Sequence, residues 1–328
     1  MRRAPISPPM TASSDPLDAL DLHPASGRIR SRKLAGGVAT IIADATGLSK
    51  AGREQLEADL RSAALAIPSV SEARVALTAA QPMRRLVAIA SGKGGVGKST
   101  LAANLAIALA RSGHKVGLID ADIYGPSQPT LLGSSARPEA EGDRLIPVEA
   151  QGLKFLSLGQ LVSPGHALAW RGPMATGALA RLVEADWGDC ELLLVDMPPG
   201  TGDVQLSLIQ KSQPAGALIV STPQDLSLID ARRAIDLFAK TDVPVLGIVE
   251  NMSGYACPNC GEESEPFGAG GAEAAAKELG VPFLGRLPLS LELRRASDAG
   301  VPLGKGREAD AFARLATKLI ETLDTAGG

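Results

Sequence analysis

The segment SGKGGVGKST at residues 91–100 brings glycines, two lysines and two terminal hydroxyl residues together. Residues 92–99 satisfy the P-loop pattern GxxxxGK[ST], directly after an apolar run at 86–90 and before a helical pattern at 100–111. In such a loop, successive backbone N–H groups converge on phosphate oxygens, and the positive end of the helix faces them. The predicted chemistry is therefore binding of a nucleoside triphosphate.

Two side chains of this loop are expected to contact the bound nucleotide and its metal ion. Lys98 is expected to reach the β- and γ-phosphates, and Ser99 to offer its hydroxyl to Mg²⁺. A tight glycine turn without a ligand would not require either residue. The predicted nucleotide-binding set comprises Gly92, Lys93, Gly94, Gly95, Val96, Gly97, Lys98, Ser99 and Thr100.

Carboxylates follow two of the predicted strands. Asp120 and Asp122 come after the apolar run KVGLI, and Asp196 comes after ELLLV. Open parallel sheets place their ligands at the carboxyl ends of strands, and Mg²⁺ prefers oxygen ligands. Taken singly, each aspartate could be a helix cap. Beside a P-loop, the three together predict a magnesium site.

The sequence Cys257-Pro258-Asn259-Cys260 has the spacing at which two thiolates from one turn can share a metal. A tetrahedral zinc site or a [4Fe-4S] cluster commonly takes four such ligands, so this pair is half a site. Cys190 precedes an apolar strand, where a buried and inert thiol is expected. Two facing copies of the chain would supply four thiolates around one metal centre.

Three other interpretations of this cysteine pair remain open. A thioredoxin-like dithiol also has the CxxC spacing, but there the pair opens a helix, whereas here it lies among Gly, Glu and Pro residues. A zinc ion shared by two copies would need the same number of ligands as an iron-sulfur cluster. The third interpretation is a surface loop without a ligand.

Short apolar runs separated by helical stretches indicate the architecture that positions these residues. The runs lie at residues 86–90, 115–120, 153–158, 191–196, 216–221, 243–250 and 281–287. This pattern is typical of a parallel sheet covered on both faces. Aromatic residues make up only 3% of the chain, which favours helices packed on a sheet. The predicted fold is a doubly wound α/β domain of the P-loop NTPase type, closed by a helix at 310–323.

A smaller domain precedes this one. Residues 37–43 alternate like a strand, residues 52–66 have helical apolar spacing, and residues 71–80 again suggest a strand. We therefore expect a disordered tail at 1–25, a small α+β domain at 26–80, a linker at 81–86 and the P-loop domain at 86–325.

Composition limits the classes of function. The formal net charge of −3 gives no overall attraction to nucleic acid or anionic membranes. No apolar run approaches the ~18 residues that a membrane span needs. Three cysteines in 328 residues argue against a disulfide framework and indicate a reducing compartment, for which the cytoplasm is the expected location.

Several segments together resemble the Mrp/ApbC group of P-loop ATPases, which carry iron-sulfur clusters. They span residues 86–304 in order and comprise KGGVGKS, DADIYGPSQP, RGPMATGAL, LLLVDMPPGTGDVQLSL, STPQDLSLID, GIVENMSGYACPNCG, FGAGG and SDAGVPLG. The small N-terminal domain resembles one that often precedes this ATPase. Relatives frequently carry a cysteine there, whereas none precedes Cys190 in this chain.

The resemblance implies roles for individual residues. Lys93 would reach the phosphates bound by the other subunit of a homodimer. Asp122 would orient the attacking water, while Asp120 and Asp196 would act on Mg²⁺ through waters. Asn251 would contact adenine. Lys93, Lys98 and Asp122 form the implied catalytic set, because the protein's part in phosphoryl transfer is mostly positioning and charge neutralisation.

The resemblance also implies an activity. A [4Fe-4S] cluster would bridge Cys257 and Cys260 of two subunits and pass to apo iron-sulfur client proteins, with a cluster-assembly scaffold as its source. No nucleic acid or membrane partner is expected. One alternative is a positioning ATPase similar to those that place chromosomes or septa. Another is a nucleotide switch with a structural zinc bridging a dimer.

Overall fold

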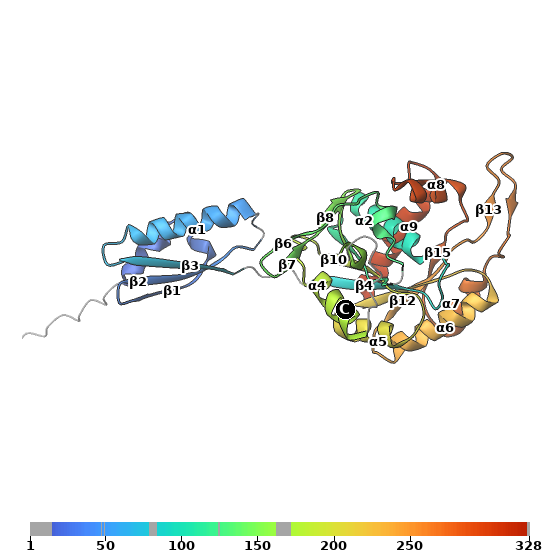
Figure 1. The fold of residues 1–328 in the computed structure, drawn as a ribbon, viewed down its shortest axis with the longest axis horizontal. Helices are drawn as coiled ribbons and strands as arrows, with labels where there is room; N and C mark the ends of the chain where they lie inside the picture. The colour runs from blue at the N-terminus through green and yellow to red at the C-terminus, as the bar shows by residue number, and fades with distance from the viewer. Residues whose placement is uncertain are drawn as a thin grey trace, which may run out of the picture. The chain divides into compact units, whose positions relative to one another are not determined.

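The largest sheet lies in the C-terminal part of the chain. The computed structural model describes residues 15–46, 48, 50–78, 84–123, 125–161 and 172–326, and within these ranges the sheet has eight strands in the order β15-β12-β11-β4-β10-β5-β9-β8 (Figure 1). All neighbouring pairs are parallel except β8 with β9. The parallel strands are β4 (Arg85–Ala90), β5 (Val116–Asp120), β9 (Leu153–Ser157), β10 (Leu192–Asp196), β11 (Gly216–Ser221), β12 (Val245–Glu250) and β15 (Phe283–Arg286).

The seven parallel strands coincide with the seven apolar runs of the sequence. Strands β5, β10 and β11 are buried at every residue, as expected for strands covered on both faces. The prediction of a doubly wound α/β fold is therefore confirmed. The edge strand β8 (Val148–Ala150) is antiparallel and only three residues long, which is too short for its pattern to be recognised.

Two layers of helices cover the sheet. On one face, α2 (Lys98–Arg111), α8 (Leu291–Ala299) and α9 (Arg307–Ala326) pack on side chains such as Val87 and Leu118. On the other face, alternate strand residues such as Ala88 and Ile119 share a core with four further helices. Those helices are α4 (Gly172–Val183), α5 (Asp203–Ser212), α6 (Asp225–Ala239) and α7 (Gly271–Leu279).

Some short elements were not predicted. They are α3 (Gln128–Leu131), the 3₁₀ helix η3 (Leu158–Leu161) and two hairpins, one of β6 (Glu139–Glu141) with β7 (Arg144–Ile146) and one of β13 (Tyr255–Ala256) with β14 (Glu263–Ser264). Elements of two to four residues carry too little pattern to be identified. Helix α2 also begins at Lys98, two residues before the predicted start, because the end of the P-loop is itself its first turn.

The backbones of two distant segments meet beside α3. A Cβ added to Gly133 would lie 2.3 Å from the carbonyl oxygen of Gly300, and one added to Gly300 would lie 2.4 Å from the Cα of Gly133. Both residues also have positive φ angles. The Gln151 side chain donates from Nε2 to the carbonyls of Leu132, at 3.3 Å, and of Gly300, at 3.0 Å. These contacts fix the end of α3 against the end of α8.

The N-terminal part of the chain forms a smaller unit. Its sheet has the order β1-β2-β3, with β1 (Ile29–Ala35) antiparallel to β2 (Val38–Asp44) and β3 (Glu72–Thr78) parallel to β2. Helix α1 (Lys50–Leu65) connects β2 to β3. The predicted β-α-β pattern is present, and β1 is an additional strand whose charged sequence hides its alternation.

The chain divides into units of residues 1–82 and 83–328. The prediction of a disordered tail was wrong for residues 16–22, which form the 3₁₀ helix η1 (Pro16–Leu22) because Leu17 and Leu20 are buried in the core of the smaller unit. Residues 26–28, where the small domain was expected to start, form the short η2 (Ser26–Arg28). Residues 1–14 of the predicted tail and residues 81–83 of the predicted linker lie outside the described residues.

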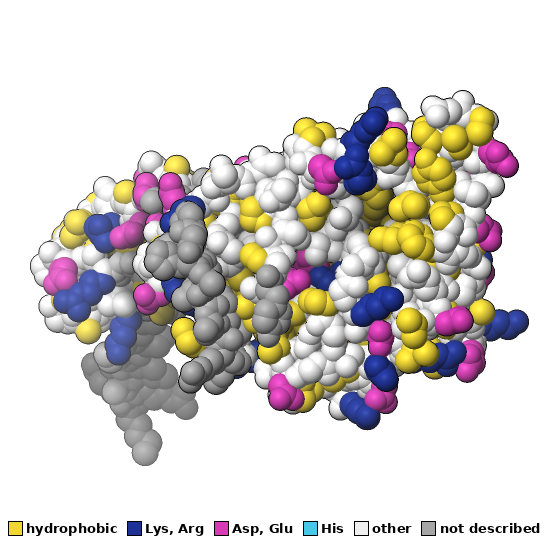
Figure 2. Space-filling model, turned by 45° about the vertical axis from the view of Figure 1, so that its right-hand side comes forward, with side chains coloured by type: hydrophobic (Ala, Val, Ile, Leu, Met, Phe, Trp, Pro, Cys, Tyr) yellow, Lys and Arg dark blue, Asp and Glu magenta, His cyan; other side chains and the backbone are white. Residues whose placement is uncertain are grey.

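The surface carries charges of both signs. Lys and Arg side chains are interspersed with Asp and Glu side chains over the face displayed in Figure 2. Among the described residues, no helix is both long enough and apolar enough to span a bilayer.

Candidate nucleotide site and cysteine hairpin

The P-loop connects β4 to α2 near the middle of the sheet, with β10 and β11 on either side of β4. Gly97 is the N-cap of α2 and has a left-handed conformation with φ of 81°. A Cβ at Gly97 would lie 2.3 Å from Nδ2 of Asn251. The last glycine of the loop is therefore required both by its backbone conformation and by the close approach of Asn251.

Lys98 and the strand-end carboxylates lie together. The Lys98 ammonium forms an ion pair with Asp196 and lies 3.4 Å from Oγ of Ser99. Asp196 is the register partner of Asp120 on the neighbouring strand β5. The sequence placed these four residues at one edge of the sheet, and the structure brings them into one buried cluster, in which the Lys98 side chain is 5% exposed and both aspartates 0%.

The electrostatics of this cluster favour a cation. Burial, with the nearby Asp196 charge, raises the pKa of Asp120 to about 7. Hydrogen bonds from Ser157 Oγ at 2.9 Å and from the Gln128 backbone N–H at 3.1 Å act in the opposite direction, because they favour the carboxylate. Two buried carboxylates, of which only Asp196 is paired with Lys98, leave uncompensated negative charge when both are ionised.

Asp122 lies at the margin of the same cluster. It is 9% exposed, and its Oδ1 accepts a hydrogen bond from the Gly125 backbone N–H at 3.2 Å. Its own backbone N–H donates to Oδ1 of Asp120 at 3.2 Å. The segment after β5 is thus folded back on both aspartates.

Lys93 lies near the start of the P-loop, whereas Asn251 contacts the loop near its end. Lys93 is half-buried, its carbonyl accepts a hydrogen bond from Ser91 Oγ at 2.8 Å, and its ammonium forms no ion pair with any residue that the structure describes. Asn251 donates from Nδ2 to the carbonyl of Val96 at 2.8 Å. The family resemblance implies that Asn251 contacts adenine. In the structure its side-chain amide donates to the P-loop itself.

Gln128 was missed by the sequence analysis. It is 0% exposed, and its Nε2 donates to Oδ2 of Asp196 at 2.8 Å and to the carbonyl of Ser99 at 3.0 Å. Gln128 lies in the segment DADIYGPSQP, which carries part of the family resemblance, but the resemblance implied no role for it. The signal available was its place in the segment DADIYGPSQP, which follows a strand that ends in a carboxylate.

The two cysteines lie at the end of a hairpin that projects from the body of the larger unit, where β13 is labelled in Figure 1. The Cys257 backbone N–H donates to the Glu262 carbonyl at 2.9 Å, and the Gly261 N–H donates to the Cys257 carbonyl at 2.8 Å. Cys257 is half-buried, whereas Cys260 is exposed. Hydrogen bonds from the backbone amides of Cys260 and Asn259 hold the pKa of the Cys257 thiol below its usual value.

One copy of the chain offers only half of a metal site here. Among the described residues, no group of three or more His, Cys, Asp or Glu side chains is arranged to hold a metal ion. The two thiols of the hairpin therefore need further ligands from another molecule if they are to hold a cluster.

A buried carboxylate holds the base of the hairpin. Glu250, at the end of β12, is 0% exposed and accepts hydrogen bonds from Ser253 Oγ at 2.6 Å, the Gly270 N–H at 2.8 Å and the Ala272 N–H at 2.7 Å. Arg286 Nε lies 3.4 Å from the same carboxylate. Glu250 thus fixes the chain before and after the cysteine hairpin, and its neighbour Asn251 holds the P-loop.

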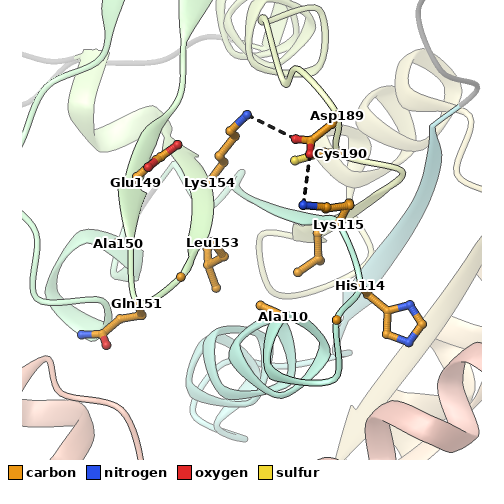
Figure 3. A pocket seen from close by; sticks show the side chains of 13 residues that line it. Ala110, His114, Lys115, Glu149, Ala150, Gln151, Leu153, Lys154, Asp189 and Cys190 are labelled. Carbon is orange, nitrogen blue, oxygen red and sulfur yellow. Dashed lines mark ion pairs between the residues drawn. The ribbon is translucent and has the colours of Figure 1, made fainter. Parts of the chain in front are cut away.

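Cys190 lies elsewhere. It borders a cavity of about 610 Å³ at the amino ends of β5, β9 and β10, opposite to the P-loop edge (Figure 3). In this cavity Asp189 lies between Lys115, at 3.2 Å, and Lys154, at 3.6 Å, so that the carboxylate faces both cations. Cys190 is 3% exposed, and burial raises the pKa of its thiol. It is a buried residue, as its place before an apolar strand predicts.

Comparison with known proteins agrees with this geometry. Residues 82–324 match the ParA family profile described as "NUBPL iron-transfer P-loop NTPase". The chain is 46% identical over 288 residues to an iron-sulfur cluster carrier protein of Deinococcus radiodurans, which covers 84% of this chain and 82% of that protein.

Solved structures show the same fold. A nucleotide-binding protein of Archaeoglobus fulgidus, in complex with ADP, is 38% identical with a TM-score of 0.59 over 69% of this chain and 90% of that one. The cell division ATPase MinD of Pyrococcus furiosus is 24% identical with a TM-score of 0.57, over 73% of this chain and 99% of that one, and shares the fold.

Proposed function

Because the chain belongs to the family of iron-transfer P-loop NTPases, we propose that it is an ATP-hydrolysing homodimer that binds a labile [4Fe-4S] cluster between its two copies and transfers it to apo-proteins. The observation that carries the proposal is that one unit holds both a P-loop with buried carboxylates and an exposed hairpin with two thiols. The cluster comes from an assembly scaffold, and the protein acts in the cytoplasm without a nucleic acid or membrane partner.

The residues around Lys98 fit Mg²⁺. Ser99, Asp120 and Asp196 offer a hydroxyl and two carboxylates, which are the oxygen donors that this ion prefers. A divalent cation would also offset the burial and the Asp196 charge, which together raise the pKa of Asp120. When bound, Mg²⁺ neutralises charge on the β- and γ-phosphates. With nucleotide bound, Lys98 would pair with phosphate oxygens in place of Asp196, and the Asp196 carboxylate would then be available to the metal.

Hydrolysis follows from positioning. The amides of residues 92–100 hold the phosphates, and Asp122 accepts a hydrogen bond from the attacking water and so directs its oxygen at the γ-phosphorus. The bond to the β–γ bridging oxygen then breaks, giving ADP and phosphate. Lys93, whose ammonium forms no ion pair within the described chain, contributes positive charge to the phosphates held by the other copy.

The apolar surface beside the P-loop supports the homodimer. A Cβ at Gly92 would lie 2.0 Å from the Asp230 carbonyl oxygen, so the second turn of α6 contacts the loop. On that part of α6, Leu226 is 71% exposed and Ile229 is 48% exposed. Large apolar side chains next to a charged site are suited to contact with a second copy.

Two thiols from each copy complete the cluster site. The lowered pKa of Cys257 favours the thiolate, which is the form that binds iron. The exposed hairpin lets thiolates of a recipient approach and replace the four cysteine ligands one after another. Transfer of this kind exchanges ligands and needs no change in oxidation state.

Asn251 and Glu250 offer a route by which nucleotide changes the hairpin. Asn251 binds the Val96 carbonyl in the P-loop, and Glu250 holds Ser253 at the base of the hairpin. A shift of the P-loop on nucleotide binding therefore acts on the cysteines through two consecutive residues. ATP is expected to change the rate at which the loaded dimer releases its cluster.

The decisive experiment is anaerobic reconstitution with iron and sulfide, followed by absorption spectroscopy, analysis of iron and zinc, and sedimentation. Wild type should bind about four iron atoms per pair of chains. Cys257→Ala and Cys260→Ala should each abolish the cluster while nucleotide still binds, whereas the matched control Cys190→Ala should keep it. A loaded species that sediments as one chain, zinc in place of iron, or a cluster retained by either hairpin variant would contradict the proposal.

A further inference from the structure

Gln128 contacts each residue expected to act on Mg²⁺. Its backbone N–H donates to Oδ2 of Asp120 at 3.1 Å, and its Nε2 donates to Oδ2 of Asp196 at 2.8 Å and to the Ser99 carbonyl at 3.0 Å. The side chain is wholly buried. Neither the P-loop pattern nor the magnesium carboxylates explain why a glutamine is buried at this position.

The other half of its carboxamide has no partner. Oε1 of Gln128 is buried and accepts no hydrogen bond from any residue that the structure describes. An unpaired buried carbonyl costs ~1–3 kcal/mol. Rotating the amide by 180° would not help, because Asp196 and the Ser99 carbonyl are both acceptors and only the NH₂ group can face them. The oxygen is therefore fixed as an acceptor for a donor from outside the protein.

We propose that Gln128 is a positioning residue of the magnesium site, whose Oε1 accepts a hydrogen bond from a water bound to Mg²⁺. The inference rests on the proposed nucleotide site. Mg²⁺ in nucleotide sites usually keeps several of its waters, and those waters are strong donors because the ion polarises them. Oε1 of Gln128 gives one of these waters an acceptor. The backbone N–H of Gln128 meanwhile keeps Asp120 in place, and its Nε2 keeps Asp196 in place.

An amide suits this position better than the other polar side chains. A glutamate would add a third negative charge beside Asp120 and Asp196 and would lose both donors. A lysine would compete with Lys98 for Asp196. An amide donates to the carboxylate and accepts from a water through one planar group that carries no charge.

The backbone around Gln128 is held firmly enough for such a role. The residue begins α3, Pro129 follows it within the first turn, and the end of α3 is fixed by the contact between Gly133 and Gly300. The amide can thus be prepositioned at the end of β5.

The test compares nucleotide affinity with and without metal. The dissociation constant of ADP is measured in Mg²⁺ and in EDTA, and Mn²⁺ binding to the ADP complex is followed by electron paramagnetic resonance. In Gln128→Leu, the gain in ADP affinity due to Mg²⁺ should fall about tenfold, as expected for the loss of one hydrogen bond to a charged centre, and Mn²⁺ affinity should fall by the same factor. Affinity in EDTA should stay within about twofold, because the direct phosphate contacts remain.

Gln210→Leu is the control, because this exposed glutamine lies on α5 and takes no part in the carboxylate cluster or in the contacts that fix α3. It should leave the gain due to Mg²⁺ unchanged. If Gln128→Leu does not fold, the unbranched Gln128→Met carries the same expectation.

The assignment is overturned if Gln128→Leu keeps the gain due to Mg²⁺, or loses affinity equally in Mg²⁺ and in EDTA. A wild type whose ADP affinity does not depend on metal would overturn the magnesium site itself and this assignment with it. Failure here is thus distinguishable from failure of the cluster proposal, which the cysteine variants test separately.

Discussion

At the scale of residues, charge compensation organises the nucleotide site. Lys98 faces Asp196, Asp196 neighbours Asp120, and Asp120 is stabilised as a carboxylate by Ser157 and by a backbone amide. Each group depends on the next because all are buried, and a buried charge without a partner is costly. In the proposed complex, ATP and Mg²⁺ would bring charges that fit this set, since phosphate would pair with Lys98 and the metal with the carboxylates.

The three thiols should differ sharply in reactivity. The Cys257 pKa is lowered by backbone hydrogen bonds and that of Cys190 is raised by burial, so at neutral pH the thiolate fraction is larger at Cys257 and negligible at Cys190. In the metal-free folded protein, iodoacetamide should modify Cys257 at least about tenfold faster than Cys190, because thiolate is the nucleophile. Peptide mass spectrometry of timed samples measures this.

The same reaction in denaturant is its control. Unfolding removes both effects, so Cys190 and Cys257 should then react at similar rates. Equal rates in the folded protein would contradict the burial of Cys190 and the hydrogen bonds around Cys257.

The sequence predicted the candidate-site residues that belong to motifs or stand at strand ends, and several of them lie together in the structure. The P-loop glycines, Lys98, Ser99 and the aspartates could be predicted because a phosphate loop needs a fixed spacing and parallel strands end at one edge. Gln128 and Glu250 could not, because their importance comes from contacts made across the chain. Glu250 closes a strand and looks like any polar residue there until the N–H groups of Gly270 and Ala272 are seen to meet it.

At the scale of elements, the cysteine hairpin is a two-stranded projection whose order depends on its base. β13 and β14 contribute only two residues each, which is too little pairing to be stable alone. The bonds from Ser253 and Gly270 to Glu250 therefore matter more than the hairpin ladder.

Glu250→Gln should loosen the hairpin. The amide keeps the shape but turns one acceptor into a donor that faces backbone N–H groups, and it removes the charge facing Arg286. We expect a loss of ~2–3 kcal/mol in the free energy of unfolding. Hydrogen exchange followed by mass spectrometry should show that residues 253–264 exchange faster in Glu250→Gln than in wild type. The strands of the eight-stranded sheet should show a smaller change.

Glu265→Gln is the matched control, since Glu265 is exposed in the same segment between β12 and α7. It should change stability by less than ~0.5 kcal/mol. Unchanged exchange of residues 253–264 in Glu250→Gln would show that the carboxylate does not hold the hairpin.

The long elements were predictable and the short ones were not. Seven strands of the main sheet had apolar runs of their own, whereas β13 and β14 are polar and brief, so only the CxxC spacing marked that region. Strand β1 was missed because Arg30, Arg32 and Lys33 dominate its composition. Strand β1 is ordered by its pairing with β2, which the sequence of β1 alone does not predict.

At the scale of the whole molecule, the chain consists of two units with separate cores. The apolar cluster of the smaller unit draws only on residues 17–77, and the two clusters of the larger unit draw only on residues 86–323. The chemistry assigned above lies entirely within the larger unit. The smaller unit has no cysteine, so it offers no thiolate to the proposed cluster.

Residues 83–328 should therefore fold and bind nucleotide when expressed alone. Each unit has its own core, which is the usual condition for independent folding. Circular dichroism should show a cooperative thermal transition, and ADP affinity in Mg²⁺ should lie within about twofold of that of the full chain, as expected for a site with no contribution from the first unit. Loss of either property would mean that the smaller unit supports the nucleotide site.

The contact between Gly133 and Gly300 limits how the nucleotide site can respond. Because the backbones touch, any side chain larger than hydrogen at either position would push α3 away from α8. The segment that carries Asp122 is thus fixed on its C-terminal side by this contact and on its N-terminal side by strand β5, which ends at Asp120. A rearrangement around Asp122 during the proposed hydrolysis is therefore limited at both ends by contacts that do not depend on the nucleotide.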